Sequence, residues 1–447
     1  LGVSSENKVV QHTGVGRTNV DELSIDFIKT RYAYISTALW TTTNIYGDSI
    51  FSLNMGPPTS ITWGKGIVMP PVSFLQQLFK YWRGGFKLRF KMVKTAFQRG
   101  RIMIAYSPGT VTSAFTVDQS EYLYRQIIDV STTSEFEVCI PYLQPQPWLL
   151  NGTTMGLVQI FVIDPLVAPA VVSTTVPILV ELCADDDFEL AIPVDWEYVP
   201  YAPAVIQSDD TYVVTPCITL GPTRSSTIET TPLTIGEKVS SLRQLIKRMM
   251  TSNAYTVAPG AGVSSAPYAY CPVLQATSNT SALLKDNTSP DLLTLVQGCY
   301  CFTTGSLREY YRIVNANTPN ATPPNLAVYA HYPNGNVAQK AYISVSAEVP
   351  KIKTWSSVNI EGVITYQTPV WNQLYARSNF GNMVNVGAGQ SSSVYCANGT
   401  IIVVADPFTS SGTGATNSNW IYSRSAGDDF HAFRWMGVPA VVAVSAT

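Results

Sequence analysis

The segment FKLRFKM, residues 86–92, alternates apolar and basic residues without a break. Side chains of a β-strand point to opposite faces in turn, so this segment predicts a strand with one buried face and one wet, cationic face. The segment RIMIAY, residues 101–106, predicts the next strand, and the turn residues SPG at 107–109 end it. Residues 136–140 alternate in the same way. Short strands separated by turn residues favour an antiparallel β-sandwich.

Further strand signals follow along the whole chain. Residues 157–163 and 176–182 are apolar almost throughout, which predicts strands that are buried on both faces. Residues 188–192 predict another strand, which ends at Pro193. Later in the chain we predict strands at 307–314, 326–332, 341–349, 358–367, 401–405 and 430–436.

Three short segments have helical periodicity instead. The first spans 72–79, and the second spans 236–250 with its apolar residues on one stripe. The third spans 292–296, where Ser289 is placed to cap the helix and Pro290 occupies its first position.

A stretch rich in Pro, Thr and Ser, residues 201–235, lacks periodicity and predicts a linker. It separates a first domain, 1–200, from a second domain, 236–447. Each domain has a length natural for an eight-stranded jelly roll with long loops. The predicted fold class is therefore all-β, with two tandem eight-stranded antiparallel jelly-roll β-sandwiches and a few short helices.

The composition favours a subunit of a large assembly. Of the 447 residues, 46% are hydrophobic and only 13% are charged, against about 25% charged in a typical soluble domain. Such a chain must have a surface of uncharged polar groups or bury much of its surface against partners. The formal net charge of −2 gives no sign of a nucleic-acid-binding protein.

Reactive motifs are scarce. The seven cysteines are dispersed, odd in number and without a CxxC motif, which favours free buried thiols over a disulfide framework or a zinc site. His12, His331 and His431 are isolated, and neither GxSxG nor HExxH occurs. We predict no metal, no cofactor and no enzymatic turnover. Since no apolar run approaches the ~20 residues that cross a bilayer, we also predict no membrane span.

The first domain resembles the capsid proteins of picorna-like viruses. Residues 79–91, FKYWRGGFKLRFK, are similar to that family's signature of a helix, Trp-Arg-Gly and strand C. Residues 93–109 resemble its passage from strand C to strand D. Residues 184–193, ADDDFELAIP, resemble the last strand of a VP3-type subunit. Gln98 departs from the pattern, because the family often has His there.

The second domain resembles a VP1-type subunit of the dicistrovirus, iflavirus and marnavirus kind. Residues 236–248 are similar to the segment that leads into that subunit, and GSLR at 305–308 is similar to its strand C. TPVWNQLY at 368–375 resembles one of its loops, and residues 427–439 resemble its C-terminal strand. In those families the two subunits are usually separate chains, whereas here they are joined.

The resemblance implies a structural capsid protein of a non-enveloped, icosahedral, positive-strand RNA virus, whose pseudo-T=3 shell encloses the genome. The second domain would then surround the five-fold axes. The implied partners are further copies of the chain, a VP2-type subunit and genomic RNA bound without sequence specificity inside the shell, while the host receptor stays unnamed. The implied location is the virion, after assembly in the host cytoplasm.

One motif could be reactive, the tripeptide formed by Asp428, Asp429 and Phe430. The resemblance implies that it assists a one-time cleavage of a precursor subunit. Two adjacent carboxylates at a crowded interface can raise each other's pKa, so that one acts as a general base. The alternative is a polar turn before the last strand, because the first domain ends on the same motif. That weaker copy consists of Asp186, Asp187 and Phe188.

Two basic clusters could contact RNA phosphates, which need no sequence readout. The first is the run of Lys87, Arg89, Lys91, Lys94, Arg99 and Arg101, for which a solvated sheet face or pairing with acidic neighbours is the favoured interpretation. The second lies on the 236–250 helix, and its RNA-facing candidates are Lys238, Arg243, Lys247 and Arg248.

Two other classes of protein are built from paired sandwiches. A secreted two-domain β-sandwich carbohydrate-binding or adhesion protein would need a signal peptide, paired cysteines or an acidic calcium cluster. A β-sandwich glycosidase would need two carboxylates across a cleft. None of these features is evident in the sequence.

Overall fold

In the computed structural model, the chain divides into two compact units. The first jelly roll comprises Ser24–Asp195 and Val205–Ser241, and the second comprises Leu1–Leu23, Trp196–Ala204 and Leu242–Thr447. The structure describes residues 20–56, 59–63, 66–109, 113–195, 198–202, 217–222, 234–235, 238–257, 264–269, 292–304, 307–315, 326–331, 351–353, 363–364, 377–378, 400–405, 418–428 and 430–443.

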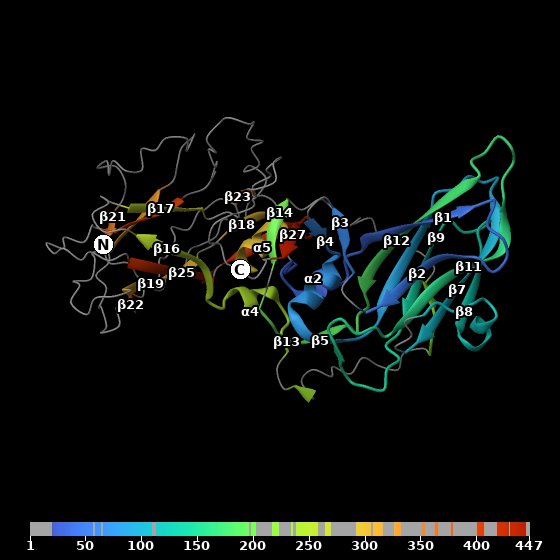
Figure 1. Ribbon diagram of the computed structural model, residues 1–447, viewed down its shortest axis with the longest axis horizontal. Coiled ribbons are helices and arrows are strands. Elements are labelled where there is room, and N and C mark those ends of the chain that lie inside the picture. The colour runs from blue at the N-terminus through green and yellow to red at the C-terminus, as the bar shows by residue number, and fades with distance from the viewer. Residues whose placement is uncertain are drawn as a thin grey trace. The chain divides into compact units, whose positions relative to one another are not determined.

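Two four-stranded layers make up the framework of the first jelly roll (Figure 1). One layer has the order β1-β12-β6-β9, with bounds Ala33–Thr41, Thr175–Ala184, Phe86–Met92 and Glu135–Ile140. The other has the order β2-β11-β7-β8, with bounds Ser49–Met55, Gly156–Val167, Arg99–Pro108 and Tyr124–Asp129. Neighbours in both layers are antiparallel. Counted along the chain, the orders are 1-8-3-6 and 2-7-4-5, which is a jelly roll.

This count corrects one implication of the resemblance. When the eight framework strands are lettered B to I in chain order, β6 is strand D and β7 is strand E. The resemblance assigned them to strands C and D, one letter too early. The strands β1 and β2, which come first, have a weaker alternation of apolar and polar residues than β6.

The core of the first jelly roll lies between its two layers. The ring of Phe51 from β2 meets the ring of Phe90 from β6 edge-on, with centroids 6.0 Å apart. Phe90 also stacks on Phe136 of β9 at 5.1 Å. The β11 segment Gly156–Val162 is buried on both faces, as its apolar run predicts, whereas β12 alternates buried and half-buried residues.

A smaller sheet and a helix close one end of this sandwich. The sheet has the order β10-β5-β13, with bounds Leu149–Leu150, Phe79–Arg83 and Glu189–Pro193. The helix α2 is Pro71–Gln77, so the predicted 72–79 helix ends earlier and Phe79 begins strand β5. The remaining elements of this part of the chain are α1 (Ile25–Lys29), β3 (Ile61–Trp63), β4 (Gly66–Val68) and the 3₁₀ turn η1 (Gln119–Tyr122).

The second jelly roll repeats the same topology. Its layers have the orders β16-β25-β19-β22 and β17-β24-β20-β21, which again count as 1-8-3-6 and 2-7-4-5. The bounds of the first layer are Met250–Val257, Ser418–Ala426, Leu307–Asn315 and Val363–Ile364. The bounds of the second layer are Ser264–Ala269, Thr400–Ala405, Leu326–His331 and Lys351–Lys353.

The closing sheet and helix are repeated as well. The sheet β23-β18-β26 consists of Arg377–Ser378, Tyr300–Thr304 and His431–Trp435, and the helix α5 is Leu292–Gly298. Even a local backbone detail recurs. Ile192 on β13 and Arg434 on β26 both have positive φ, 58° and 63°, and each lies four residues after the Phe of its Asp-Asp-Phe motif. The shared topology confirms the predicted all-β jelly-roll class.

The two units differ from the boundaries predicted from sequence. Strand β14 (Tyr198–Ala202) pairs with β27 (Ala440–Ala443) inside the second jelly roll. Strand β15 (Cys217–Thr219), inside the predicted 201–235 linker, pairs in parallel with β9. Backbone hydrogen bonds to a sheet edge require no hydrophobic periodicity, and for this reason the sequence pattern does not reveal β15.

The predicted 236–250 helix is wrong in extent. Among the described residues 238–250, the helix is confined to α4, Leu242–Ile246, because the Ser240 carbonyl accepts the Ile25 N–H and Met250 begins β16. Among the other predictions, the 341–349 strand and the Ser289 and Pro290 cap lie outside the described residues.

Candidate functional site

The first Asp-Asp-Phe motif forms a turn between β12 and β13. The Phe188 N–H donates to the Asp185 carbonyl at 3.1 Å, and the Asp185 N–H donates to the Gly85 carbonyl at 2.9 Å. The Asp187 carboxylate accepts the Gly85 N–H at 2.8 Å. Residues 185–188 are therefore bound to the Trp-Arg-Gly-Gly corner that follows β5.

The corner needs glycine for this contact. Gly84 has φ of +108°, and a Cβ there would lie 2.4 Å from the Phe188 Cα. A Cβ on Gly85 would lie 2.7 Å from the Ile140 carbonyl oxygen. No real Cβ approaches a backbone atom that closely, so Gly84 allows the turn to pack against the corner, and Gly85 allows the corner to pack against β9.

The aromatic ring of this turn is part of the core. Phe188 is 2% exposed, and its ring stacks on Trp82 at 6.2 Å between centroids. It also meets the Phe86 ring edge-on at 5.4 Å. Burial of this size anchors the turn by hydrophobic packing.

A lysine from α1 secures the backbone of the turn. The Lys29 ammonium donates to the Asp186 carbonyl at 2.9 Å and to the Phe188 carbonyl at 3.2 Å. It also pairs with Asp26, one turn earlier on α1, at 2.6 Å. Lys29 is 5% exposed, and these three contacts compensate for the burial of its charge.

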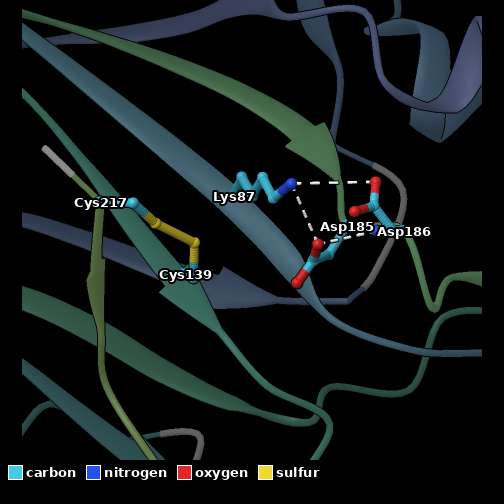
Figure 2. The surroundings of a disulfide bond; sticks show 5 residues. All are labelled: Lys87, Cys139, Asp185, Asp186 and Cys217. Carbon is cyan, nitrogen blue, oxygen red and sulfur yellow. Dashed lines mark hydrogen bonds and ion pairs between the residues drawn. A yellow bond between two sulfur atoms is a disulfide. The ribbon is translucent and has the colours of Figure 1, made fainter. Parts of the chain in front are cut away.

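The carboxylates of the first turn are already engaged. The Lys87 ammonium lies 3.1 Å from Asp185 and 3.9 Å from Asp186 (Figure 2). Burial alone would lower the pKa of Lys87, but Asp185 and Asp186 raise it above its ordinary value of 10.5. The side chain of Asp186 is 71% exposed. This geometry supports the interpretation of the first copy as a structural turn.

The second motif occupies the equivalent position, between β25 and β26. The Phe430 N–H donates to the Gly427 carbonyl at 3.3 Å, and Phe430 is 2% exposed. Asp428 has a side chain that is 70% exposed and pairs with Lys247 at 3.1 Å. Asp429 lies outside the described residues.

An arginine from α4 holds the second turn. The Arg243 guanidinium donates to the Phe430 carbonyl and lies 3.2 Å from Nδ1 of His431. It also pairs with Asp21 at 3.4 Å. The carbonyl of the motif's Phe is therefore bound by a lysine in the first jelly roll and by an arginine in the second.

The RNA-facing candidates are placed unequally. Arg243 and Lys247 hold the second turn through contacts within the protein. Lys238 is half-buried and outside the helix, and Arg248 follows the helix and is exposed. In this group, Arg248 presents its side chain most openly to solvent.

The predicted wet, cationic face of residues 86–92 is wrong. The Arg89 side chain is 5% exposed, and its Nη2 lies 2.6 Å from Oε2 of Glu181 on β12. Lys91 pairs with the other oxygen of Glu181 at 3.1 Å. The Arg89 guanidinium also lies 4.0 Å from the centroid of the Tyr32 ring. The charges are neutralised inside the sheet face, which favours the interpretation of pairing with acidic neighbours.

The cysteine prediction needs a correction too. Cys139 on β9 and Cys217 on β15 form a disulfide, with Cα atoms 6.7 Å apart (Figure 2). Cys183 and Cys299 are free and buried, as the sequence predicts for most of the thiols. The sequence does not reveal the disulfide, because the two cysteines are 78 residues apart and have no characteristic spacing.

Sequence reasoning also missed Lys29. The dipeptide Ile-Lys, at 28–29 and again at 246–247, precedes the first strand of each jelly roll and could have drawn attention to it, although Arg243 is the residue that binds the Phe carbonyl in the second. Within the described ranges, no group of three or more His, Cys, Asp or Glu side chains could hold a metal ion. No helix in the described part of the chain has the length and apolarity needed to cross a membrane.

Comparisons with known proteins agree with this topology. A family model described as CRPV capsid protein like matches residues 227–446, and one described as picornavirus capsid protein matches residues 72–152. The structural polyprotein of Cricket paralysis virus is 26% identical over 228 residues, which cover 45% of this chain and 25% of that protein. The genome polyprotein of Deformed wing virus is 23% identical over 206 residues, which cover 40% of this chain and 7% of that protein.

The chain thus spans a quarter or less of the length of these two relatives. Among solved structures, the empty capsid of Triatoma virus has a TM-score of 0.40 and 23% identity, covering 43% of this chain and 84% of that one. That TM-score is too low to add weight to the assignment, which rests on the family models. Since the two models together match most of the residues, the chain belongs to the capsid proteins of picorna-like viruses.

Proposed function

We propose that this chain supplies two neighbouring jelly-roll subunits to the icosahedral, pseudo-T=3 shell of a non-enveloped virus with a positive-strand RNA genome. Residues 1–200 would act as the VP3-type subunit and residues 236–447 as the VP1-type subunit, joined through the 201–235 segment. The observation that carries the proposal is the repetition of one eight-stranded topology in a single chain. The role is structural, as in the capsid family as a whole.

Assembly is the property to test first. Purified chain, alone and together with a VP2-type subunit, is examined by negative-stain electron microscopy. Closed shells of uniform diameter support the proposal. A chain that stays monomeric under all conditions, and in the presence of its partner, contradicts it and returns the adhesion-protein alternative to consideration.

A mass measurement of the subunit in particles addresses the joined arrangement. A single mass near 48.7 kDa means that the 201–235 segment is intact. Two smaller masses mean that it is cut, and the chain then supplies two separate subunits.

RNA inside the shell is the proposed second partner, and the virion, after cytoplasmic assembly, is the proposed location. Ultraviolet crosslinking of RNA in purified particles, followed by peptide mapping, tests the basic segment. We expect crosslinked peptides that contain Lys238 and Arg248, and none that contain Arg101, whose charge pairs with Asp164 at 3.1 Å. Crosslinks at Arg101 alone would reverse the assignment.

The cleavage role of Asp428, Asp429 and Phe430 stays a prediction. Asp428 and its counterpart Asp186 are equally exposed, at 70% and 71%, and each pairs with a lysine. The second copy differs in having Gly427 where the first turn has the lysine-paired Asp185, and it is the copy that we propose for the cleavage role. Asp429→Asn should stop cleavage of the precursor in assembled particles, whereas Asp187→Asn should not. Normal cleavage of the precursor in the Asp429→Asn particles would contradict the cleavage role of this motif.

A further inference from the structure

Residues 217–220, which belong to the first jelly roll but lie outside its eight framework strands, are fastened to the edge of one of its sheets. Strand β9 would be the outer strand of the layer β1-β12-β6-β9, and β15 extends that layer by pairing with it. The contact is small, because β15 spans only Cys217–Thr219 and its residues are exposed, half-buried and exposed in turn. Short parallel pairing contributes little stability by itself.

Two further contacts hold this segment. The Leu220 N–H donates to the Cys139 carbonyl at 3.0 Å, and the Leu220 side chain is 3% exposed. The other contact is the Cys139–Cys217 disulfide, which joins the two strands covalently (Figure 2). Without the disulfide, residues 217–220 would keep the backbone pairing with β9, the Leu220 N–H bond and the burial of the Leu220 side chain.

The pair is accessible to redox reagents, unlike the thiols of Cys183 and Cys299. Cys217 is exposed and Cys139 is half-buried. Cys183, in contrast, is 2% exposed, and burial raises its pKa to about 12, so almost none of it is thiolate at neutral pH. The thiolate is the form that attacks disulfides, and attack also requires access. Exchange chemistry is thus directed to the 139–217 pair.

We propose that Cys139 and Cys217 form a redox-sensitive latch, which fastens residues 217–220 to the β9 edge under oxidising conditions and releases them under reducing ones. A small-molecule disulfide such as oxidised glutathione is the oxidant. One cysteine thiolate attacks it, and a mixed disulfide forms as one glutathione thiolate leaves. The second cysteine thiolate then attacks the mixed disulfide and releases the second glutathione. The two cysteines lose two electrons, and the two glutathiones gain them together with the two thiol protons.

Hydrogen exchange of the full chain tests the latch. The protein is oxidised with glutathione disulfide and compared with and without dithiothreitol. We expect the amides of residues 217–220 to exchange on the order of tenfold faster after reduction, since local opening then needs no covalent bond to break. Cys217→Ser should exchange fast in both conditions. Cys183→Ser is the matched control and should behave like the wild-type chain.

Three outcomes overturn the proposal. Alkylation of Cys139 and Cys217 in the oxidised, denatured chain before any reduction means that they form no disulfide. Equal exchange of residues 217–220 in both conditions means that the disulfide does not control the segment. Equal acceleration of the β11 amides means that the disulfide stabilises the whole jelly roll and is not a local latch. None of these results depends on whether the chain forms a shell.

Discussion

The two Asp-Asp-Phe turns share a backbone and differ in their charges. In both, a buried Phe ends the turn, and a residue with positive φ follows four positions later. In both, a cation from the short helix that precedes the first strand of the jelly roll binds the carbonyl of that Phe. The first turn has a third acid, Asp185, which Lys87 neutralises. The second has Gly427 at that position, and its Asp428 is exposed beside Lys247.

This comparison separates structure from possible chemistry. What both copies keep is needed to fold a jelly-roll end, since neither sandwich closes without a fixed turn after its last framework strand. What differs is free to serve another purpose. Asp428 and its counterpart Asp186 are equally exposed, so a role in maturation is to be sought in what is particular to the second copy, which is Gly427 in place of Asp185. It is not to be sought in the Phe or in the cation that binds its carbonyl.

The largest expected effect comes from removing the shared Phe. Phe188→Ala and Phe430→Ala should each destabilise their own jelly roll by about 3–5 kcal/mol, because each leaves a cavity in a packed core. Native-state hydrogen exchange measures this, with β6 and β12 amides reporting on the first unit and β19 and β25 amides on the second. Phe97→Ala is the control, since Phe97 is 68% exposed and its loss should cost less than about 0.5 kcal/mol. If Phe188→Ala loosens both units equally, the turns are not local structures.

The cations that hold the turns should have the next largest effect. Lys29→Met leaves two carbonyls without a charged donor, and Arg243→Met leaves one. Hydrogen bonds to charged groups contribute about 1.5–3 kcal/mol each, so we expect at least a loss of that size in the matching unit, with the larger loss for Lys29→Met. The exposed Arg248→Met serves as the control in the same exchange experiment. A loss no larger than that of Arg248→Met would mean that the turns are stable without the bound cation.

The third acid gives the first turn its own pH dependence. Because the folded pKa of Lys87 is raised above 10.5, the Lys87–Asp185 contribution is fully present below that pH and is lost as pH rises through the folded value. A double-mutant cycle with Lys87→Met and Asp185→Asn, measured by chemical unfolding between pH 8 and pH 12, isolates this contribution from the titration of other groups. We expect a constant coupling energy below about pH 10 and a decline above it. A coupling energy that is flat across the range contradicts the assignment.

The smallest effect is expected at the residues with positive φ. Left-handed backbone costs an L-residue about 1–2 kcal/mol, and glycine costs about 0.5–1 kcal/mol in lost freedom, so Ile192→Gly should stabilise the first unit by up to about 1 kcal/mol. Arg434→Gly should gain less, because Ile is β-branched and tolerates this conformation poorly. Thermal unfolding followed by calorimetry provides the comparison. A destabilised Ile192→Gly would show that the contacts of the Ile192 side chain, which is 44% exposed, outweigh the backbone cost.

Much of the fold was predictable because it depends on local patterns. The alternation in β6 and the apolar run in β11 identify strands without any knowledge of their neighbours. The exposure of the basic face of β6 was predicted wrongly, because it depends on contacts that are distant in the sequence. Glu181, which neutralises Arg89, lies 92 residues further along the chain, so only the register of β12 against β6 brings the two together.

The site was predictable in its motifs and not in its partners. Both Asp-Asp-Phe copies are visible in the sequence, but the lysine and arginine that hold them come from short helices whose positions depend on tertiary packing. The helix predicted at 236–250 is also shorter in the structure because of tertiary contacts. Its last residue, Met250, already pairs with β25 as the first residue of β16. The Cys139–Cys217 pair carries no sequence signal at all.

The covering of the β9 edge by β15 also sets an order of events during synthesis. Strand β9 leaves the ribosome well before Cys217, which follows Cys139 by 78 residues. At typical rates of about 5–20 residues per second, the edge stays open for roughly 4–16 seconds in each nascent chain. An uncovered edge can accept a strand from a neighbouring chain. On a crowded polysome, the translation speed through this stretch therefore affects how many chains reach a correctly folded first jelly roll.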